Sequence, residues 1–190
     1  MDQQEESTIL TGAKIGQTIT RMAHEIVEKN KDLNDFVIIG IKTRGAVLAQ
    51  RLAKELMGIT ESERIIPVGA LDVSLYRDDF ERTGAQLTAE TTDIHFSIED
   101  TTVLLVDDVL FTGRTINAAI RALFDMGRPR RIKLAVLIDR GHRELPYRPD
   151  YCGKNVPTQY VEKIRVRLKE TDDRDVVLSG PGSGGRGKGE

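Results

Sequence analysis

Two adjacent acids and a short hydroxyl-bearing turn are the residues of this sequence best suited to chemistry. Asp107 and Asp108 follow an apolar run, and Thr112-Gly113-Arg114-Thr115 then opens a segment with helical spacing. A turn before a helix presents unpaired N–H groups and the positive end of the helix dipole, which together favour a phosphate. Ionised carboxylates only accept hydrogen bonds, which suits sugar hydroxyls. The stretch therefore predicts a site for a ribose 5-phosphate.

The residues around this stretch indicate the elements that position it. The apolar residues 103–106 predict a buried parallel strand whose carboxyl end carries the two acids. Apolar residues at helical spacing from Ile116 to Met126 predict a helix that stops at Gly127. A nucleotide-triphosphatase acid strand is the alternative, but it requires a Gly-x-x-x-x-Gly-Lys-Ser/Thr partner that the sequence lacks.

A second strand and loop have a similar arrangement. The apolar residues 36–41 predict a strand, and Lys42-Thr43-Arg44-Gly45 leads from it into a helix. Gly40 and Gly45 permit close backbone approach, and Lys42 or Arg44 can pair with an anion. The loop is either an ordinary strand-to-helix turn or a second phosphate site.

Composition bounds the class of protein. The 190 residues are 39% apolar with a net charge of −2, which predicts a single α/β domain over 1–178. The alternation of strands and helices predicts a mainly parallel, twisted sheet flanked by helices. No apolar run approaches the roughly 20 residues of a membrane span, and the N-terminus is acidic, so we expect a cytoplasmic protein. A single cysteine, Cys152, excludes an internal disulfide, and the scattered histidines do not match structural zinc.

The remaining segments predict a peripheral architecture. We expect a helix over about 11–29, strands at 67–73, 91–96 and 131–139, and a pair formed by 164–168 and 176–178. Prolines and cations predict an irregular basic loop after residue 139, and the Gly-rich residues 179–190 predict a disordered tail. The loop at about 74–92 is either a mobile lid or a solvent hairpin without a role.

The stretch of two acids followed by Thr-Gly-x-Thr resembles the 5-phosphoribosyl-1-pyrophosphate (PRPP) signature of type I phosphoribosyltransferases. From about residue 11 to 178 the sequence most resembles the bifunctional PyrR family of pyrimidine-operon regulators. Thr20-Arg21-x-x-His24, Ser74-Leu75-Tyr76-Arg77-Asp78-Asp79 and the run from Asp139 to Pro149 carry this resemblance. It implies a type I phosphoribosyltransferase fold with a small hood at about 140–160 and a flexible loop at about 74–92.

The resemblance also implies two activities. One is the transfer of phosphoribose from PRPP to uracil, which gives UMP and pyrophosphate and uses Mg²⁺ held mainly through PRPP rather than by a metal site of the protein. The other is binding of the pyr mRNA leader in response to UMP or UTP, with control by attenuation or translation. It implies a homodimer or larger homo-oligomer, and neither DNA nor membrane as a partner.

The resemblance assigns each role to particular residues. The catalytic residues are Asp107, Asp108 and Arg77, and the base-binding residues are Asp139, Arg140 and Gly141. The residues expected to bind PRPP are Lys42, Thr43, Arg44, Gly45, Val103, Leu104, Leu105, Val106, Asp107, Asp108, Val109, Leu110, Phe111, Thr112, Gly113, Arg114 and Thr115. The residues expected to bind RNA are Thr20, Arg21, His24, His142, Arg143, Arg148 and Lys154.

The sequence is also consistent with other functions. A hypoxanthine/guanine phosphoribosyltransferase without an RNA role has a similar core, but Phe111, Asp139 and Arg167 stand where that family has an acid, a lysine and an aspartate. Thr20, Arg21 and His24 could form an ordinary solvated helix face, and the basic loop could merely shield the active site. A regulator with decayed catalysis is disfavoured, because no PRPP-binding position is lost.

Overall fold

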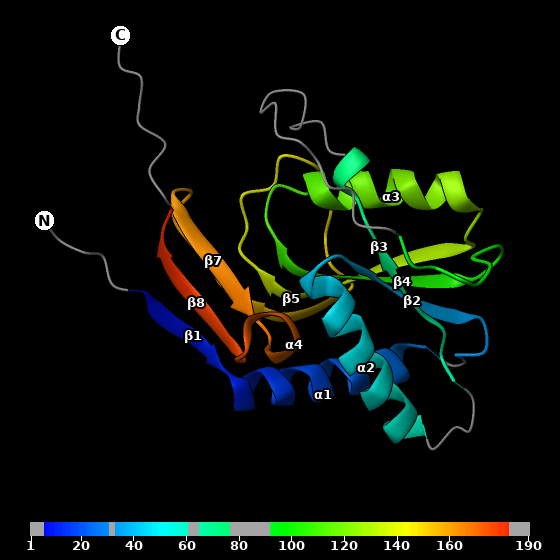
Figure 1. The fold of residues 1–190 in the computed structure, drawn as a ribbon, viewed down its shortest axis with the longest axis horizontal. Coiled ribbons are helices and arrows are strands. Elements are labelled where there is room, and N and C mark those ends of the chain that lie inside the picture. Colours follow the sequence, from blue (N-terminus) through cyan, green and yellow to red (C-terminus); the bar gives the residue numbers. More distant parts are fainter. Residues whose placement is uncertain (1–5, 31–32, 61–64, 77–91, 183–190) are drawn as a thin grey trace, which may run out of the picture.

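The computed structural model describes residues 6–30, 33–60, 65–76 and 92–182. Its centre is a five-stranded parallel sheet of order β3-β2-β4-β5-β6 (Figure 1). The strands are β2 (Phe36–Ile41), β3 (Val68–Leu71), β4 (Thr102–Leu110), β5 (Arg131–Asp139) and β6 (Tyr151–Asn155). The predicted α/β architecture with a parallel sheet is confirmed.

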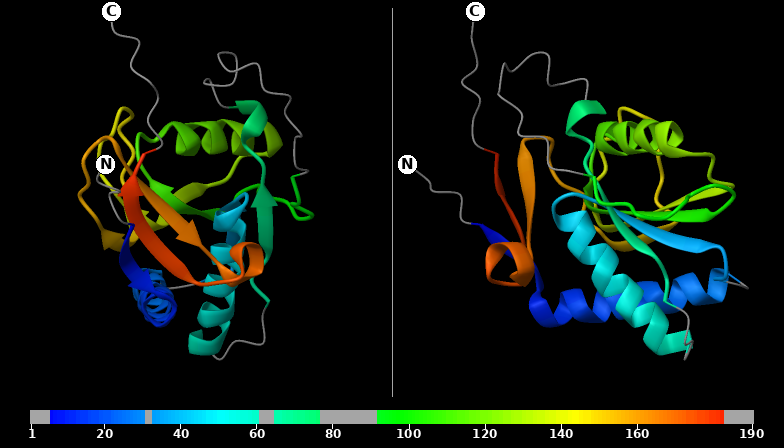
Figure 2. Two further views of the ribbon diagram at one scale, coloured as in Figure 1. Left: turned by 60° about the vertical axis from the view of Figure 1, so that its left-hand side comes forward. Right: turned by 45° about the vertical axis from the view of Figure 1, so that its right-hand side comes forward.

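Helices cover both faces of this sheet (Figure 2). On one face lie α1 (Gly12–Lys29) and α2 (Arg44–Thr60), and on the other lies α3 (Arg114–Met126). The predicted buried stripe of the first helix is confirmed, because Ile15, Ile19, Met22 and Ile26 are all buried. Among the described residues, no helix is long and apolar enough to cross a membrane.

A small antiparallel sheet of order β1-β8-β7 stands beside the main sheet. It consists of β1 (Ser7–Thr11), β7 (Glu162–Arg167) and β8 (Val176–Pro181), and the short helix α4 (Lys169–Asp172) lies between β7 and β8. The predicted pairing of the last two strands is confirmed. The tail prediction was wrong for residues 179–181, which belong to β8, and the rest of that tail from residue 183 lies outside the described residues.

Two peripheral predictions differ from the structure. Residues 151–155, expected within a basic loop and a hood at 140–160, form the edge strand β6, because their backbone pairs in parallel with β5. Residues 92–96 are not a strand, since only Asp93 makes an isolated bridge, to Ala70. The short helix η1 (Ser74–Tyr76) begins the expected flexible loop, but residues 77–91 of that loop lie outside the described part of the chain.

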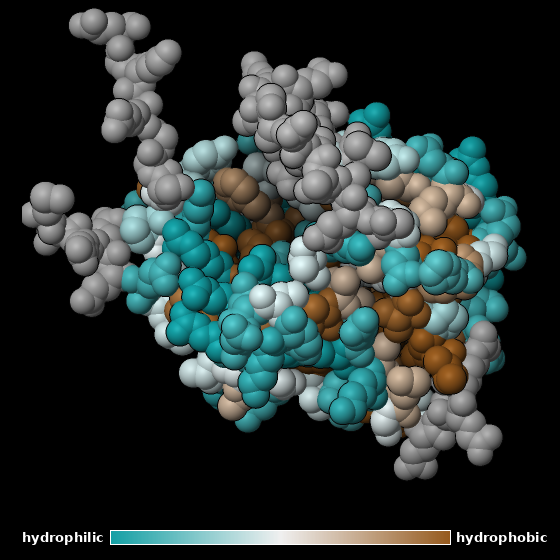
Figure 3. All heavy atoms as spheres, in the orientation of Figure 1, coloured by the Kyte–Doolittle hydropathy of each residue, from teal (hydrophilic) through white to brown (hydrophobic). Residues whose placement is uncertain are grey.

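Ion pairs attach the small sheet to α2. Arg51 of α2 pairs with Glu170 and Asp175, and Arg44 at the start of α2 pairs with Asp172. Hydrophilic side chains gather over this junction of the small sheet, α4 and α2 on the face drawn in Figure 3. The small sheet is therefore held to the first turns of a helix that starts at the edge of the main sheet.

Candidate functional site

The predicted loops meet at one edge of the main sheet. The parallel register pairs Gly40 of β2 with Val106 of β4, and Leu110 of β4 with Asp139 of β5. The carboxyl ends of these three neighbouring strands therefore open side by side, as is typical of ligand sites in parallel α/β sheets. The loops that follow them are 42–43, 111–113 and 140–150.

The two acids lie in the carboxyl-terminal part of β4, as expected, and the strand continues past them to Leu110. Asp107 is 6% exposed, and its Oδ1 accepts a hydrogen bond from the Asp108 N–H at 2.9 Å. Asp108 Oδ1 accepts from the Val109 N–H at 2.9 Å. Burial raises the pKa of Asp108, and the charge of Arg44 opposes this rise. A cationic or hydroxyl-rich ligand would relieve the cost of keeping this carboxylate ionised.

The expected phosphate loop has a suitable backbone. Gly113 adopts φ of 92° directly before α3, a conformation that favours glycine. A pocket of about 370 Å³ opens here, lined by Asp107, residues 109–116 and Glu144. Arg114 is exposed and pairs with Glu144, with its Nε 2.8 Å and its terminal nitrogen 2.7 Å from the same carboxylate oxygen. The phosphate pocket thus contains an acid of its own, which is neutralised by Arg114.

The second loop also packs closely against its neighbours. A Cβ on Gly40 would overlap the backbone of Gly45 and Ala46, which confirms the expected close approach. Arg44 is the first residue of α2, and its guanidinium donates to both carboxylate oxygens of Asp172, at 3.1 and 2.7 Å. This contact raises the pKa of Arg44 and holds the pKa of Asp172 well below its usual range. A pyrophosphate at this loop would compete with Asp172 for Arg44.

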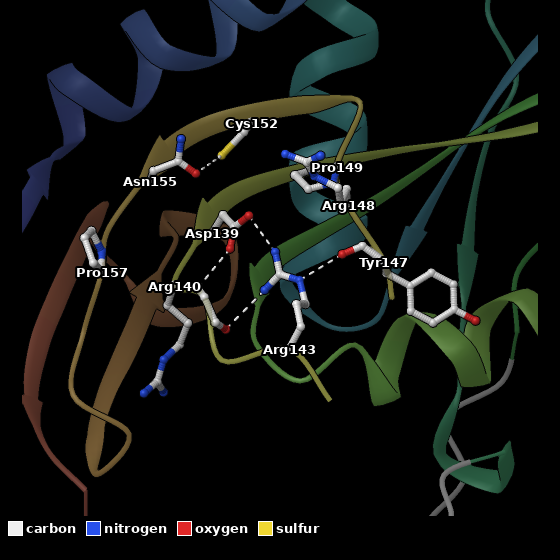
Figure 4. A pocket seen from close by; sticks show the side chains of 10 residues that line it. Asp139, Arg140, Arg143, Tyr147, Arg148, Pro149, Cys152, Asn155 and Pro157 are labelled. Atoms are coloured by element: carbon white, nitrogen blue, oxygen red, sulfur yellow. Dashed lines mark hydrogen bonds and ion pairs between the residues drawn. The ribbon is translucent and has the colours of Figure 1, made fainter. Parts of the chain in front are cut away.

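The expected base-binding residues point in different directions (Figure 4). The Asp139 carboxylate accepts from the Gly141 N–H at 3.0 Å and pairs with Arg143 at 2.6 Å. Asp139, Gly141 and Arg143 line a second pocket of about 480 Å³, between the 140–150 loop and β6. The Arg140 side chain turns the other way, where its donors meet the 158–160 segment.

The structure divides the basic residues expected to bind RNA. Arg143 donates to the carbonyl oxygens of Phe111, Gly141 and Tyr147, and a ring nitrogen of His142 lies 2.6 Å from the Thr158 carbonyl oxygen. Both side chains are therefore engaged by the protein. Arg148 is exposed.

The first-helix residues and β6 come together, although they are far apart in the sequence. Arg21 donates to the carbonyl oxygens of Cys152 and Gly153, at 3.0 and 2.6 Å. Lys154, on the same strand, is exposed, and its ammonium lies 3.5 Å from the carbonyl oxygen of Ile9. His24 is exposed on α1, whereas the Thr20 hydroxyl donates to Glu55 of α2 at 2.8 Å.

Four site residues were missed by the sequence reasoning: Glu144, Tyr147, Tyr160 and Asp172. Tyr160 is 60% exposed, its ring centroid lies 5.4 Å from that of Phe111, and its hydroxyl lies 3.3 Å from Glu144. Tyr147 donates to Asn117 of α3 at 2.8 Å. Glu144 could have been identified in the sequence as an acid within an otherwise basic loop. No local sequence feature identifies Asp172.

Within the described ranges, no group of three or more His, Cys, Asp or Glu side chains is arranged to hold a metal ion. Asp107 and Asp108 are the acids that line the strand end beside the two phosphate-type loops. Arg77, expected to be catalytic, lies outside the described residues.

Paired acids and a phosphate-type loop at the carboxyl edge of a parallel sheet define a phosphoribosyltransferase. The family described as phosphoribosyl transferase domain matches residues 5–171, and the chain belongs to it. "Bifunctional protein PyrR" of Streptomyces coelicolor is 53% identical over 178 residues, covering 94% of this chain and 91% of the relative. "Bifunctional protein PyrR" of Deinococcus radiodurans is 51% identical, covering 90% of this chain and 93% of the relative. Within that superfamily the chain is a member of the bifunctional PyrR family.

The fold is also similar to solved hypoxanthine phosphoribosyltransferases. One from Trypanosoma cruzi superimposes with a TM-score of 0.68 at 22% identity, covering 92% of this chain and 97% of that one. One from Staphylococcus aureus gives 0.66 at 19% identity, covering 93% of each chain. At these identities the likeness establishes the type I phosphoribosyltransferase fold alone, and not the nucleobase substrate.

Proposed function

We propose that this protein is a uridine-nucleotide-sensing, RNA-binding regulator of pyr operon expression that also transfers phosphoribose from PRPP to uracil. Membership of the bifunctional PyrR family supports both roles, and the paired acids beside a phosphate pocket support the enzymatic one. The observation that carries the enzymatic half is Asp107 and Asp108 at the strand end next to the Gly113 turn. Regulation acts by attenuation or by translational control of the mRNA leader.

In the proposed reaction, uracil N1 attacks ribose C1 of PRPP. The C1–N1 bond forms, the C1–oxygen bond to pyrophosphate breaks, and the N1 proton passes to solvent water. Positive charge develops on the ribose in an oxocarbenium-like transition state, which Asp107 and Asp108 stabilise while they accept hydrogen bonds from the ribose hydroxyls. Residues 112–115 hold the 5-phosphate. Catalysis rests mainly on positioning and charge.

Pyrophosphate binding falls to the loop formed by Lys42, Thr43, Arg44 and Gly45, with Arg77 as a further proposed contact. Arg44 reaches the pyrophosphate after it leaves Asp172, and the leaving group's charge supplies the replacement partner. Mg²⁺ bound together with PRPP would neutralise part of the charge of the leaving pyrophosphate. The described residues include no group of three or more side chains arranged to hold a metal ion, so PRPP oxygens would hold most of the ion.

The proposed RNA surface consists of Arg21, His24, Arg148 and Lys154, with Thr20 at its border. The packing of α1 against β6 supports it, because the exposed Arg21 side chain donates to the carbonyl oxygens of Cys152 and Gly153, next to Lys154. A net negative protein can still bind RNA through such a cluster, since phosphate attraction is local on a Debye scale of about 8 Å. His142 and Arg143 contribute by shaping the loop that carries Arg148 rather than by meeting phosphates.

Titration of UMP into a mixture of the protein and its operon leader RNA tests the whole proposal. We expect RNA affinity to rise with UMP, and uracil to release pyrophosphate from PRPP in a parallel assay. Tight RNA binding that is unaffected by UMP would refute the sensing role. Failure of uracil to release pyrophosphate would remove the enzymatic role.

Arg148→Ala and Lys154→Ala are each expected to weaken leader-RNA binding and to flatten its salt dependence. Each lost phosphate contact should reduce the slope of log affinity against log salt by about 0.7 for single-stranded RNA, and by more where the RNA is paired. The measurement is RNA affinity at several salt concentrations, beside uracil turnover, which should persist. Arg130→Ala is the matched control, because Arg130 is an exposed arginine before β5, at the opposite edge of the sheet. An unchanged slope in both variants would exclude this surface.

The loop that carries Arg148 is joined directly to the phosphate loop, which supports nucleotide sensing. The N–H groups of Glu144 and Leu145 both donate to the Thr112 carbonyl oxygen at 3.0 Å, and Glu144 pairs with Arg114. A phosphate in this pocket would compete with the Glu144 carboxylate for Arg114. The competition would shift the 140–150 loop, and with it the RNA surface.

Glu144→Gln is therefore expected to uncouple nucleotide from RNA. The amide keeps the shape but removes the competing charge, so the enhancement of RNA affinity by UMP should fall toward one, from a coupling that is typically about 5- to 150-fold. RNA affinity without UMP should move toward the value of the UMP-bound wild-type protein, since the Glu144–Arg114 pair no longer holds the loop. Glu170→Gln, which alters another arginine-paired acid, is the control. An intact UMP effect in Glu144→Gln would refute this coupling.

A further inference from the structure

Arg140 is a buried cation whose side-chain hydrogen bonds go to one segment of the chain. It is 5% exposed, and its Nε donates to the Thr158 hydroxyl at 3.1 Å. A terminal nitrogen donates to the carbonyl oxygens of Gln159 and Tyr160, at 3.1 and 3.3 Å. Its own N–H donates to the Leu110 carbonyl oxygen at 3.1 Å, at the end of β4. One residue thus connects the end of the catalytic strand to residues 158–160.

The same guanidinium stacks on the residue that follows β4. Its central carbon lies 4.1 Å from the centroid of the Phe111 ring. The rings of Phe111, His142 and Tyr160 form a cluster with centroids 5.4 to 5.9 Å apart. Phe111 lines the phosphate pocket, and Tyr160 reaches Glu144 in the lining of that pocket. The aromatic cluster therefore borders the site where a base attached to ribose C1 would lie.

Burial of this charge is expensive. Desolvation lowers the pKa of Arg140, and Glu162 and Tyr160 only partly offset this. A charge that is merely structural could be replaced by an apolar side chain at little cost, so its presence calls for a geometric reason. A planar guanidinium can satisfy several carbonyl oxygens while it stacks on a ring, which a lysine ammonium cannot do.

We propose that Arg140 is a positioning residue for uracil transfer, which fixes the 158–160 segment so that Tyr160 and Phe111 frame the base. This inference rests on the proposed uracil phosphoribosyltransferase activity. This role replaces direct base contact by the Arg140 side chain, because its Nε and one terminal nitrogen are engaged by Thr158, Gln159 and Tyr160. Asp139 and Gly141 remain the residues proposed to meet the base, through their backbone.

Arg140→Lys separates geometry from charge. Lysine keeps the positive charge but loses the fork and the stacking plane, so the KM for uracil should rise about tenfold or more, because small misplacements of a binding wall are costly. The KM for PRPP should stay within about twofold, since the PRPP loops are held by other contacts. Arg165→Lys is the matched control, because Arg165 donates to the Pro181 carbonyl oxygen and pairs with Glu6 in the small sheet, away from 158–160.

A double-mutant cycle with Tyr160→Ala tests whether Arg140 acts through the segment. Tyr160 is exposed, so its replacement should leave the fold intact and raise the KM for uracil by itself. If Arg140 works by placing Tyr160, the combined variant should be little worse than the poorer single variant. Circular dichroism melting of each variant reports folding independently of activity. If Arg140→Lys does not fold, the uracil KM of Tyr160→Ala decides the aromatic frame on which the inference depends.

The outcomes separate this inference from the proposed function. Wild-type protein without uracil-dependent pyrophosphate release would overturn the function and the inference together. Active wild type with an unchanged uracil KM in folded Arg140→Lys, equal rises in the KM for uracil and PRPP, or additive effects in the cycle would overturn the positioning role alone. A rise confined to uracil with non-additive coupling supports it.

Discussion

Hypoxanthine and guanine are expected to be used with kcat/KM values about 10⁴-fold below that of uracil, because a site without hydrogen-bond partners for a polar ligand rejects it strongly. Phe111 stands where the purine-specific relatives have an acid, and a phenyl ring cannot exchange a proton with a purine nitrogen. In the structure Phe111 is enclosed by the Arg140 guanidinium and the Tyr160 ring. The Phe111 side chain has no atom that could accept a proton, whichever rotamer it adopts.

Asp139 adds to this rejection of purines. Its carboxylate is occupied by the Gly141 N–H and by Arg143, so it offers a purine oxygen a negative charge rather than a donor. Initial rates with each base at saturating PRPP measure the ratio, and uracil with no added purine gives the reference. Comparable kcat/KM for hypoxanthine and uracil would favour the purine salvage alternative, whose fold this chain shares.

The strongest sequence patterns predicted their elements closely. The strand expected at 131–139 is β5, with the same bounds, because its apolar run is long and it lies inside the sheet. The first helix was predicted from a stripe of apolar residues, and this stripe is buried. The phosphate loop was predicted because a glycine turn between a strand and a helix has local requirements. In each case neighbouring residues carry the whole signal.

Elements defined by distant partners were missed. Tyr151–Asn155 contains a glycine and follows a proline, so its pattern suggests a loop, yet backbone pairing with β5 makes it a strand. A Cβ at Gly153 would also meet the Leu137 backbone and the Thr18 side chain, so this glycine serves close packing rather than a turn. Similarly, β1 joins a sheet with strands from the other end of the chain. Local sequence carries no record of such partners.

The site was predictable in its residue types but not in their directions. The acids and the phosphate loop lie together because parallel strands bring their carboxyl ends to one edge. By contrast, Arg44, Arg114 and Arg143 each pair with a carboxylate of the protein. A cation in a sequence predicts an anion partner without saying whether that partner is a ligand or another side chain. Only the fold separates these cases.

Asp107→Asn and Asp108→Asn are each expected to lower uracil-dependent pyrophosphate release by at least about tenfold. The amide keeps the shape of the side chain but removes the negative charge that stabilises a cationic ribose, and such electrostatic contributions are among the largest in catalysis. The loss should appear in kcat and in kcat/KM alike, because the interaction is strongest in the transition state. Asp35→Asn is the control, since Asp35 is an exposed acid that precedes β2, at the opposite edge of the sheet.

Stability distinguishes lost charge from lost structure in Asp108→Asn. Because burial raises the pKa of Asp108 above its unfolded value, the folded state holds this proton more tightly, and its contribution to stability falls as pH rises through the shifted pKa. At pH values above the shifted pKa, the ionised carboxylate therefore lowers the stability of the fold, and asparagine removes this cost. The variant should melt at or above the wild-type temperature there, and the difference should shrink as pH falls toward the ordinary aspartate pKa of about 3.9.

A variant that is inactive yet no less stable locates the defect in the chemistry. Full turnover in both variants would contradict the assignment of these acids, whereas a lower melting temperature at pH values above the shifted pKa would mean that Asp108 supports the fold instead.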